Sequence, residues 1–220
     1  MKRVNILCEG QTEEQFVNRL LIPYFEPQEI YVKPIIMATK RYVSGGKKRG
    51  GVSTYKKIAQ ELRLLCKDRD AYITSMLDYF RLPEDTPCMD QRHANIYQHV
   101  AEIEMAIDSD IRSANCHANL MVHEFEALLF SDPTAFEGIM SKSEIGSIAE
   151  IRASFDTPED INSAPETAPS KRILQIKPDY QKVTQGNEIA EKIGIDKMIA
   201  CCPHFAEWIG KLRNEQASKL

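Results

Sequence analysis

The chain has 220 residues, of which 43% are hydrophobic and 27% are charged, a composition typical of a globular protein rather than a disordered or fibrous one. Its 28 Lys and Arg against 32 Asp and Glu give a net charge of −4, which excludes a uniformly basic protein that coats nucleic acid. No apolar stretch approaches the roughly 18 residues that cross a membrane, so no membrane association is expected.

Residues 1–130 alternate short apolar segments with longer amphipathic ones. The short segments are predicted as strands, at 3–8, 31–37, 71–77 and 119–122. Apolar residues at helical spacing predict helices that begin near Thr12 and cover 53–67 and 96–111, and a further helix opens at 123–130. Strands that alternate with helices imply an α/β fold with a mostly parallel sheet of about four strands.

The pattern changes after residue 130, where helices dominate. A proline-rich stretch covers 157–169, and the tail at 188–212 is predicted as two short helices around Pro203. We therefore expect an α/β core over residues 1–130. A helical extension over 131–220 should pack on this core in a single structural unit.

The six cysteines include no CxxC pair, and the apolar run at 4–8 is too short for the core of a secretion signal. Reduced thiols and a cytoplasmic location are therefore expected. The adjacent Cys201 and Cys202 are interpreted as the edge of a buried helix rather than as a redox site.

Acidic residues follow three of the predicted strands: Glu9 and Glu13 after the first, Asp78 after the third, and Glu124 and Glu126 after the fourth. Because the carboxyl ends of parallel strands share one edge of a sheet, these carboxylates are expected to converge. Carboxylates without His or Cys partners suit Mg²⁺ or Mn²⁺, and such sites commonly serve phosphoryl transfer. The alternative is that they cap helices, which is weaker for Glu9 and Asp78 because each ends a buried strand.

A basic segment extends from 33 to 57, with eight Lys or Arg, no Asp or Glu, and two interleaved tyrosines. A flexible basic loop of this kind can follow a phosphate backbone, and the alternative is a solvated loop. It lacks the Gly-Lys-Ser/Thr of a Walker A loop, so ATP binding is unsupported. The candidate nucleic-acid-binding residues here are Lys40, Arg41, Lys47, Lys48, Arg49, Lys56 and Lys57.

A second group of candidates lies outside that segment. Lys171 and Lys182 could stabilise charge on a scissile phosphate and Arg172 could hold the nucleic acid, although a surface ion-pair network is an equal alternative. His123 adjoins Glu124 at a strand end, so it is a candidate for proton transfer or for orienting a carboxylate. The histidine spacing does not indicate a zinc site.

Several of these residues lie in motifs that carry a family resemblance. Glu9-Gly10 followed by Glu13, with Asp78 after a later strand, resembles the TOPRIM domain of topoisomerases, primases and OLD nucleases. Over nearly the whole chain, the sequence is identified as a member of a bacterial domain-of-unknown-function family, DUF4276, regarded as TOPRIM-like. The matching pieces are CEGQTE at 8–13, TSMLDYFRLP at 74–83, HEFEALLF at 123–130, APSKR at 168–172, YQK at 180–182 and CPHF at 202–205.

The resemblance implies Glu9 as a catalytic acid or base and Asp78 as a metal ligand. The second aspartate of the TOPRIM DxD pair falls on Phe80, which cannot bind a metal, and Glu124 or Glu126 is the candidate to supply the missing carboxylate. Relatives of this family are often found beside ATPases in phage-defence settings, which implies a nuclease effector with an ATPase partner.

The leading hypothesis is a Mg²⁺- or Mn²⁺-dependent phosphodiesterase that acts on nucleic acid. A rival, favoured by Phe80, is a non-catalytic subunit that binds nucleic acid or an ATPase. A third is an enzyme that transfers phosphoryl groups on small molecules. The sequence leaves open DNA or RNA, the partner's identity and the oligomeric state, a homo-oligomer included.

Overall fold

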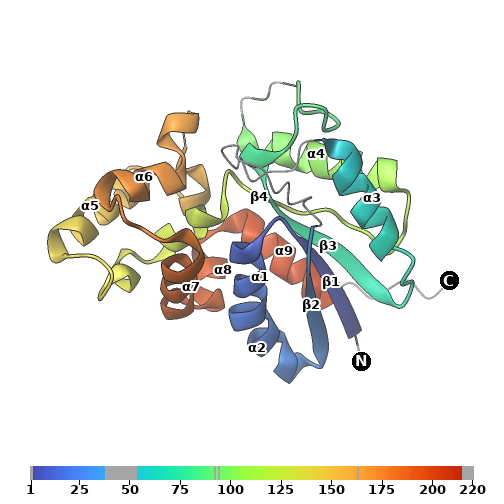
Figure 1. The fold of residues 1–220 in the computed structure, drawn as a ribbon, viewed down its shortest axis with the longest axis horizontal. Helices are drawn as coiled ribbons and strands as arrows, with labels where there is room; N and C mark the ends of the chain where they lie inside the picture. Colours follow the sequence, from blue (N-terminus) through green and yellow to red (C-terminus); the bar gives the residue numbers. More distant parts are fainter. Residues whose placement is uncertain (1, 38–53, 92, 94, 163, 215–220) are drawn as a thin grey trace, which may run out of the picture.

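Four parallel strands form one sheet in the order β2-β1-β3-β4 (Figure 1). The structure is a computed structural model that describes residues 2–37, 54–91, 93, 95–162 and 164–214. The strands are β1 (Lys2–Cys8), β2 (Ile30–Ile36), β3 (Ala71–Asp78) and the short β4 (Leu120–Met121). The predicted α/β class and parallel sheet are confirmed.

Helices flank the strands and make up the C-terminal part of the chain. They are α1 (Gln11–Phe16), α2 (Ile22–Phe25), α3 (Tyr55–Leu65), α4 (Ile96–Ile111), α5 (Lys142–Ala153), α6 (Pro169–Ile176), α7 (Lys182–Ile193), α8 (Ile195–Cys201) and α9 (Pro203–Asn214). A π-helical turn, Val17–Leu21, joins α1 to α2, and the helix predicted at 123–130 is a 3₁₀ helix, Phe125–Ser131. Among the described residues, no helix combines the length and apolar character needed to cross a membrane.

The two faces of the sheet are covered by different helices. Side chains alternate between faces along a strand, so Tyr72 and Met76 of β3 face one hydrophobic cluster while Ile73 and Leu77 face the other. Helices α3 and α4 pack in the second cluster. The first cluster contains α1, α2 and the C-terminal helices, and it continues across residue 130 into the predicted extension. Of these helices, α5 and α6 lie farthest from the strands (Figure 1).

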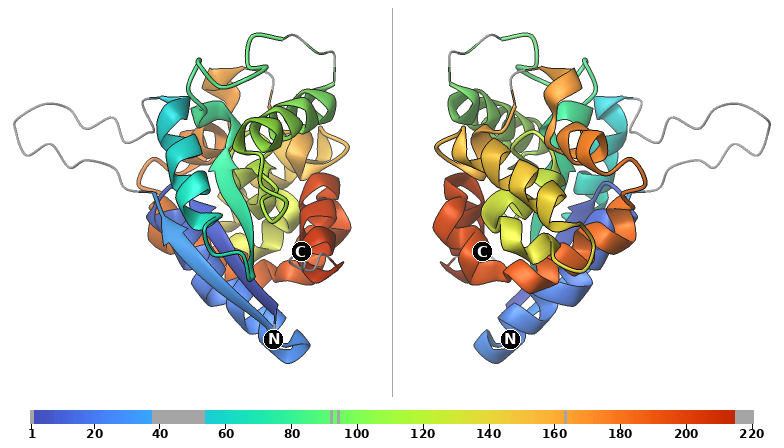
Figure 2. Two further views of the ribbon diagram at one scale, coloured as in Figure 1. Left: turned by 90° about the vertical axis from the view of Figure 1, so that its right-hand side faces the viewer. Right: turned by 90° about the vertical axis from the view of Figure 1, so that its left-hand side faces the viewer.

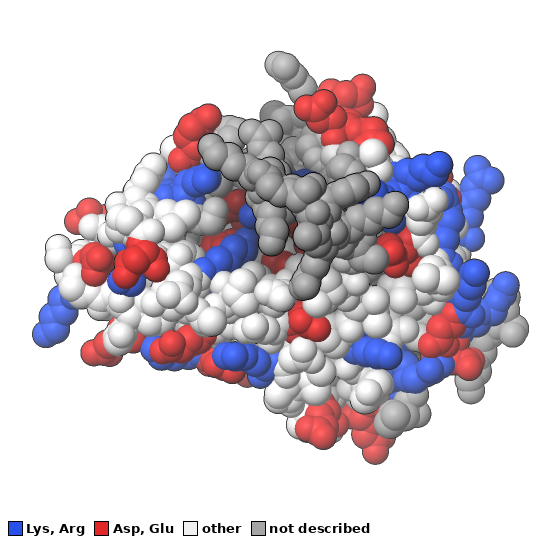
Figure 3. Space-filling view, viewed as in Figure 1, with Lys and Arg blue, Asp and Glu red and all other residues white. Residues whose placement is uncertain are grey.

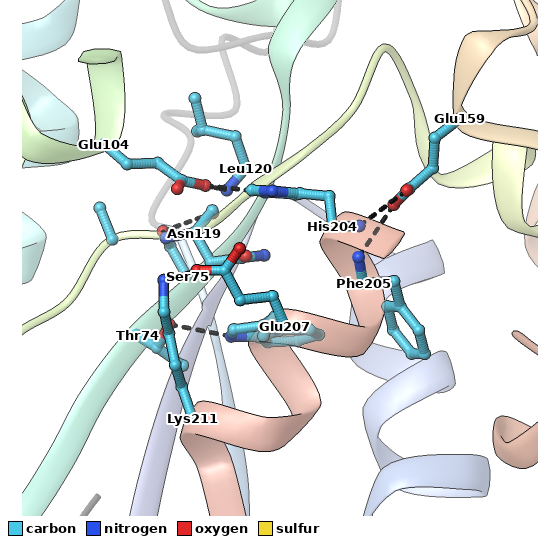
Figure 4. Close-up of polar contacts among 12 residues, drawn as sticks. Thr74, Ser75, Glu104, Asn119, Leu120, Glu159, His204, Phe205, Glu207 and Lys211 are labelled. Atoms are coloured by element: carbon cyan, nitrogen blue, oxygen red, sulfur yellow. Dashed lines mark hydrogen bonds and ion pairs between the residues drawn. The ribbon is translucent and has the colours of Figure 1, made fainter. Parts of the chain in front are cut away.

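Helix α9 is anchored to the rest of the fold by polar contacts (Figure 4). Both oxygens of the buried Glu159 accept hydrogen bonds from the backbone, one from the N–H of His204 and one from the N–H of Phe205, each at 2.9 Å. These bonds satisfy free amides in the first turn of the helix. Trp208 donates to the hydroxyl of Thr74 on β3 at 3.1 Å.

The side chain of His204 links α9 to α4, which lie close together in Figure 2. Its Nε2 lies 3.0 Å from a carboxylate oxygen of Glu104, and that oxygen also accepts the N–H of Leu120 at 2.7 Å. Burial lowers the pKa of His204, but the hydrogen bond with Glu104 and the nearby glutamates raise it by more. The pKa is therefore above its ordinary value of 6.5.

We expect this pair to make stability depend on pH. A histidine whose pKa is raised by folding contributes its full stability below the unfolded pKa and loses it as the pH rises through the folded pKa. The melting temperature of the wild type should therefore fall more than that of His204→Gln between about pH 6 and about pH 9. The control is His117→Gln, a more exposed imidazole 3.4 Å from Asp108. Parallel profiles for wild type and His204→Gln would contradict the assignment.

Candidate functional site

Acidic side chains meet where β1 and β3 end. Glu9 directly follows β1, Glu13 lies in the first turn of α1, and Asp78 is the last residue of β3. Side chains two residues apart on a strand point to the same face of the sheet. Asp78 therefore lies on the same face as Met76, which is the face that α1 and α7 cover. Glu13 and Asp78 are buried and Glu9 is largely so, which agrees with the predicted convergence.

Asp78 uses its two oxygens differently. Oδ1 accepts the backbone N–H of Phe125 at 2.9 Å, which fixes the turn that follows β4. Oδ2 lies 3.5 Å from Nζ of Lys182 and 3.7 Å from Nε of Arg81. One oxygen therefore positions backbone, while the other faces two cations.

Lys182 is the central cation of this site. It is the first residue of α7, and its Nζ lies 2.9 Å from Oε2 of Glu126, a fully buried residue of the 3₁₀ helix. Helix α7 is held against α1 because the side chain of Asn187 donates to the carbonyl of Thr12 at 3.2 Å. Both Lys182 and Glu126 are predicted site residues, and the structure brings them together.

Gly186 allows α7 to pack closely against Tyr180 and Phe125. A Cβ at this position would lie 2.7 Å from the hydroxyl of Tyr180, and 3.6 Å from the ring of Phe125. Tyr180 is buried, and that contact involves the rigid phenol rather than a flexible side chain. The glycine is therefore required by close approach, one turn after Lys182.

Arg81 belongs to the site, although the sequence motifs alone predict no role for it. It follows Asp78 by three residues in a 3₁₀ turn, Tyr79–Arg81. Its Nη1 donates to Oε1 of Glu9 at 3.3 Å. The spacing from Asp78 was the available signal, because a tight turn after a strand brings residues three apart together.

The cluster contains more carboxyl groups than cations, and the pKa values of its glutamates are raised. Burial, and next the charge of Asp78, raise the pKa of Glu9 and of Glu13 from 4.5 to about 7. Burial likewise raises the pKa of Glu126 to about 7, although Lys182 opposes the shift. Burial lowers the pKa of Lys182, but Asp78, Glu126 and Glu13 raise it by more, so it stays charged. The carboxylates thus outnumber the cations Lys182 and Arg81.

Some buried polar atoms in the cluster lack a hydrogen-bond partner among the described residues. They are Oδ2 of Asp78, both carboxylate oxygens of Glu126, and Nζ of Lys182, although Nζ forms ion pairs with Oδ2 of Asp78 and Oε2 of Glu126. Within the described parts of the chain, no three His, Cys, Asp or Glu residues form a ready set of metal ligands. Lys182 and Arg81 lie among the carboxylates instead.

Glu124 has a different role from Glu126. Its Oε2 accepts the N–H of Ser170 in the first turn of α6 at 3.0 Å, so it stabilises the start of that helix. Lys171 is exposed on the same helix. The Arg172 guanidinium donates to the carbonyl of Thr167 at 2.8 Å and packs over a phenylalanine ring. The structure therefore gives Glu124 and Arg172 local structural contacts.

His123 and Phe80 stack on each other, with ring centroids 5.2 Å apart. The N–H of Phe80 also donates to the carbonyl of His123 at 3.1 Å, so the turn that follows β3 is tied to the turn after β4. Burial lowers the pKa of His123 to about 4, and its Nδ1 lies 3.4 Å from the amide of Asn162. At neutral pH the imidazole is therefore uncharged.

Most of the basic segment falls outside the described residues, namely Lys40, Arg41, Lys47, Lys48 and Arg49, while Lys56 and Lys57 are exposed on α3. The described ends of the segment lie at the carboxyl edge of the sheet. Met37 donates its N–H to the carbonyl of Cys8 at 3.0 Å, and Tyr55 donates its N–H to Asp85 at 2.9 Å. Figure 3 shows acidic and basic side chains interspersed on this side of the molecule.

Comparison with known proteins gives the family. Residues 8–213 match the family described as "Domain of unknown function (DUF4276)". The chain belongs to this family. Searches of curated proteins and of solved structures gave no match. The membership in DUF4276 expected from the sequence motifs is thus confirmed.

We expect Lys182→Met to destabilise the protein in a pH-dependent manner. The variant leaves Glu126 and Asp78 with less compensation, which should cost about 3 kcal/mol of unfolding free energy near pH 8. Near pH 6 the loss should be smaller, because a carboxyl with a pKa of about 7 can take up a proton there. Urea unfolding at both pH values measures this difference.

The matched control is Lys192→Met on the same helix, since Nζ of Lys192 lies 3.0 Å from Glu188 on the surface. We expect that variant to lose less than about 1 kcal/mol at either pH. Equal losses for the two variants would show that Lys182 does not compensate buried charge.

Proposed function

We propose that this protein is a Mg²⁺- or Mn²⁺-dependent phosphodiesterase that acts on nucleic acid. The observation that carries the proposal is the excess of buried carboxylates over cations at the carboxyl edge of the sheet. A cytoplasmic location, a TOPRIM relationship and a role beside an ATPase in phage defence belong to the same proposal, as implications of the family resemblance.

Two oxygens support a divalent ion: Oε1 of Glu126 has no hydrogen-bond partner among the described residues, and Oδ2 of Asp78 makes ion pairs at 3.5 Å and 3.7 Å but no hydrogen bond. Mg²⁺ is usually held by only one or two carboxylates, and waters and substrate phosphates complete its shell, so a full set of protein ligands is not needed. Asp78 and Glu126 would hold the ion, with Glu13 nearby to add negative charge. When bound, a divalent ion neutralises charge on phosphate oxygens.

Proton transfer is assigned to Glu9. Its pKa of about 7 suits a group that accepts and returns a proton near neutral pH. The Arg81 guanidinium contacts Glu9 and is partly exposed, so it is placed to bind a phosphate oxygen beside that carboxylate. Lys182 would add positive charge from the buried side of the site.

The first test is Mn²⁺ binding by titration calorimetry. Wild type should bind the ion and Asp78→Asn should not, while Asp179→Asn, an exposed aspartate paired with Lys177, should bind as wild type does. Asparagine keeps the oxygen that accepts the N–H of Phe125, so the turn after β4 is retained. Equal binding by wild type and Asp78→Asn would overturn the assigned ligand.

The second part of the test is cleavage of DNA and RNA with Mn²⁺ and with a chelator. Glu9→Gln should lower the rate by about 100-fold or more without loss of Mn²⁺ binding. Unchanged cleavage by this variant would contradict the role of Glu9.

One observation favours the non-catalytic alternative. Lys182 already lies within 3.5 Å of Asp78 and 2.9 Å of Glu126, and Phe80 occupies the position of a second aspartate. A binding subunit would show no Mn²⁺ affinity, with or without an oligonucleotide, and would retain its partner in Asp78→Asn. The titration therefore separates the two functions.

A further inference from the structure

A basic recess lies at the edge of the sheet opposite the carboxylate cluster. It has a volume of about 330 Å³, and its lining comes from the end of α3, the turn before β3 and the end of α4. Along β3, Ala71 and Asp78 are seven residues apart, which is about 23 Å in an extended strand. The recess is therefore separate from the site proposed for catalysis. Four of its lining residues are cations: Arg63, Lys67, Arg69 and Arg112.

Three of these cations, Lys67, Arg69 and Arg112, form no ion pair with any other described residue, and all three are exposed. Arg63 differs, because its Nη2 lies 2.8 Å from Oδ2 of Asp110. Basic side chains are prominent at this end of the molecule, on the right in Figure 3. The recess thus gathers positive charge in a chain whose net charge is −4.

The acidic residues beside the recess are engaged elsewhere. Asp68 and Asp70, in the turn before β3, have carboxylate oxygens 2.7 Å and 3.8 Å from Nη2 of Arg3 on β1. Asp110 accepts the hydroxyl of Tyr55 as well as Arg63. The nearby carboxylates therefore already have partners outside the group of three unpaired cations.

Cations beside helix ends commonly compensate the helix dipole, and this is the alternative explanation of the recess. Helices α3 and α4 both end here. Each end carries about half a negative charge, so the two together balance about one cation. Three unpaired cations exceed that requirement by about two charges. An anion that carries more than one negative charge would supply the difference.

Arg112 gives a second, independent indication. It directly follows α4 with a φ of 54°, in the left-handed region where helices usually place glycine or asparagine. Its N–H closes the helix on the carbonyl of Asp108 at 2.9 Å, a bond that glycine would make equally well. The end of the helix therefore does not require an arginine side chain. Strained residues of this kind occur preferentially at functional positions.

We propose that the basic recess is a binding site for phosphate groups. A guanidinium presents paired N–H groups that match two oxygens of a phosphate, and an ammonium adds a point charge. The volume lies at the lower end of the range for ligand pockets, so it suits phosphate groups rather than a whole large ligand. The inference rests on this recess and not on the proposed nuclease activity.

The phosphates can come from a free polyphosphate or from the backbone of a nucleic acid. A line of exposed basic side chains on α3 connects the recess with the basic segment. Lys56 lies at the start of the helix, and Arg63 and Lys67 follow it by seven and eleven residues, which places all three on one helical face. A nucleic-acid backbone that contacts the basic segment could therefore continue along α3 into the recess.

The test measures the binding of inorganic pyrophosphate and of a single-stranded oligonucleotide to the full-length protein at low salt. The variant Lys67→Ala/Arg112→Gly should bind at least one probe about 10-fold more weakly than wild type. Loss with pyrophosphate identifies a site for free polyphosphate, and loss with the oligonucleotide alone identifies a site for the backbone. The matched control is Lys142→Ala/Lys197→Ala, which removes the same charge from exposed positions on α5 and α8.

The control should bind both probes as wild type does. No binding of either probe by wild type, unchanged affinities in the Lys67→Ala/Arg112→Gly variant, or an equal loss in the control would overturn the proposal. Arg112→Gly alone should keep or raise the melting temperature, because glycine adopts a φ of 54° without strain, so weaker binding would not reflect unfolding. Mn²⁺ binding should be unchanged in the variant, which separates this test from that of the nuclease.

Cys66 reports on the location of the bound anion, because it also lines the recess. The probe that loses affinity in the variant should slow the alkylation of Cys66 by N-ethylmaleimide in wild type. Cys88, which is also partly exposed but does not line the recess, should react at the same rate with and without the probe. Peptide mapping by mass spectrometry measures both rates. An unchanged rate at Cys66 would contradict binding in the recess.

Discussion

The arrangement of this site depends on one buried ammonium group, that of Lys182. Asp78 and Glu126 come from different parts of the chain, and their carboxylates tolerate burial together because Nζ of Lys182 lies within 3.5 Å of the first and 2.9 Å of the second. A buried ion pair is seldom a large source of stability, since desolvation offsets most of the attraction. Removal of one partner is nevertheless costly, because it leaves the opposite charge buried without compensation.

The C-terminal helices complete the carboxylate cluster rather than simply covering it. Helix α7 brings Lys182, and it is positioned by the Asn187 hydrogen bond to α1 and by the close approach at Gly186. Asp78 and Glu124 hold the connection between sheet and helices through the N–H groups of Phe125 and Ser170. Core and extension therefore share one site and one hydrophobic cluster.

The parallel sheet could be predicted from the sequence. The convergence of Glu9, Glu13 and Asp78 could also be predicted, because parallel strands bring their carboxyl ends to one edge of the sheet. The sequence could not show that Glu126, and not Glu124, pairs with Lys182. Both follow the same strand, and the difference lies in a tertiary contact, the hydrogen bond from the Ser170 N–H to Oε2 of Glu124. The partnership of Lys182 with Asp78 was equally hidden, since 104 residues separate them. The position of Arg81, by contrast, is predictable from its spacing of three residues from Asp78.

The charge of the site is adjustable as a consequence of this arrangement. Three glutamates with pKa values near 7 share or release protons according to the positive charge beside them. A divalent cation bound beside Glu9 would lower its pKa, whereas a phosphate would raise it. A carboxyl with a pKa near 7 is suited to acid–base catalysis, which is the role proposed above for Glu9.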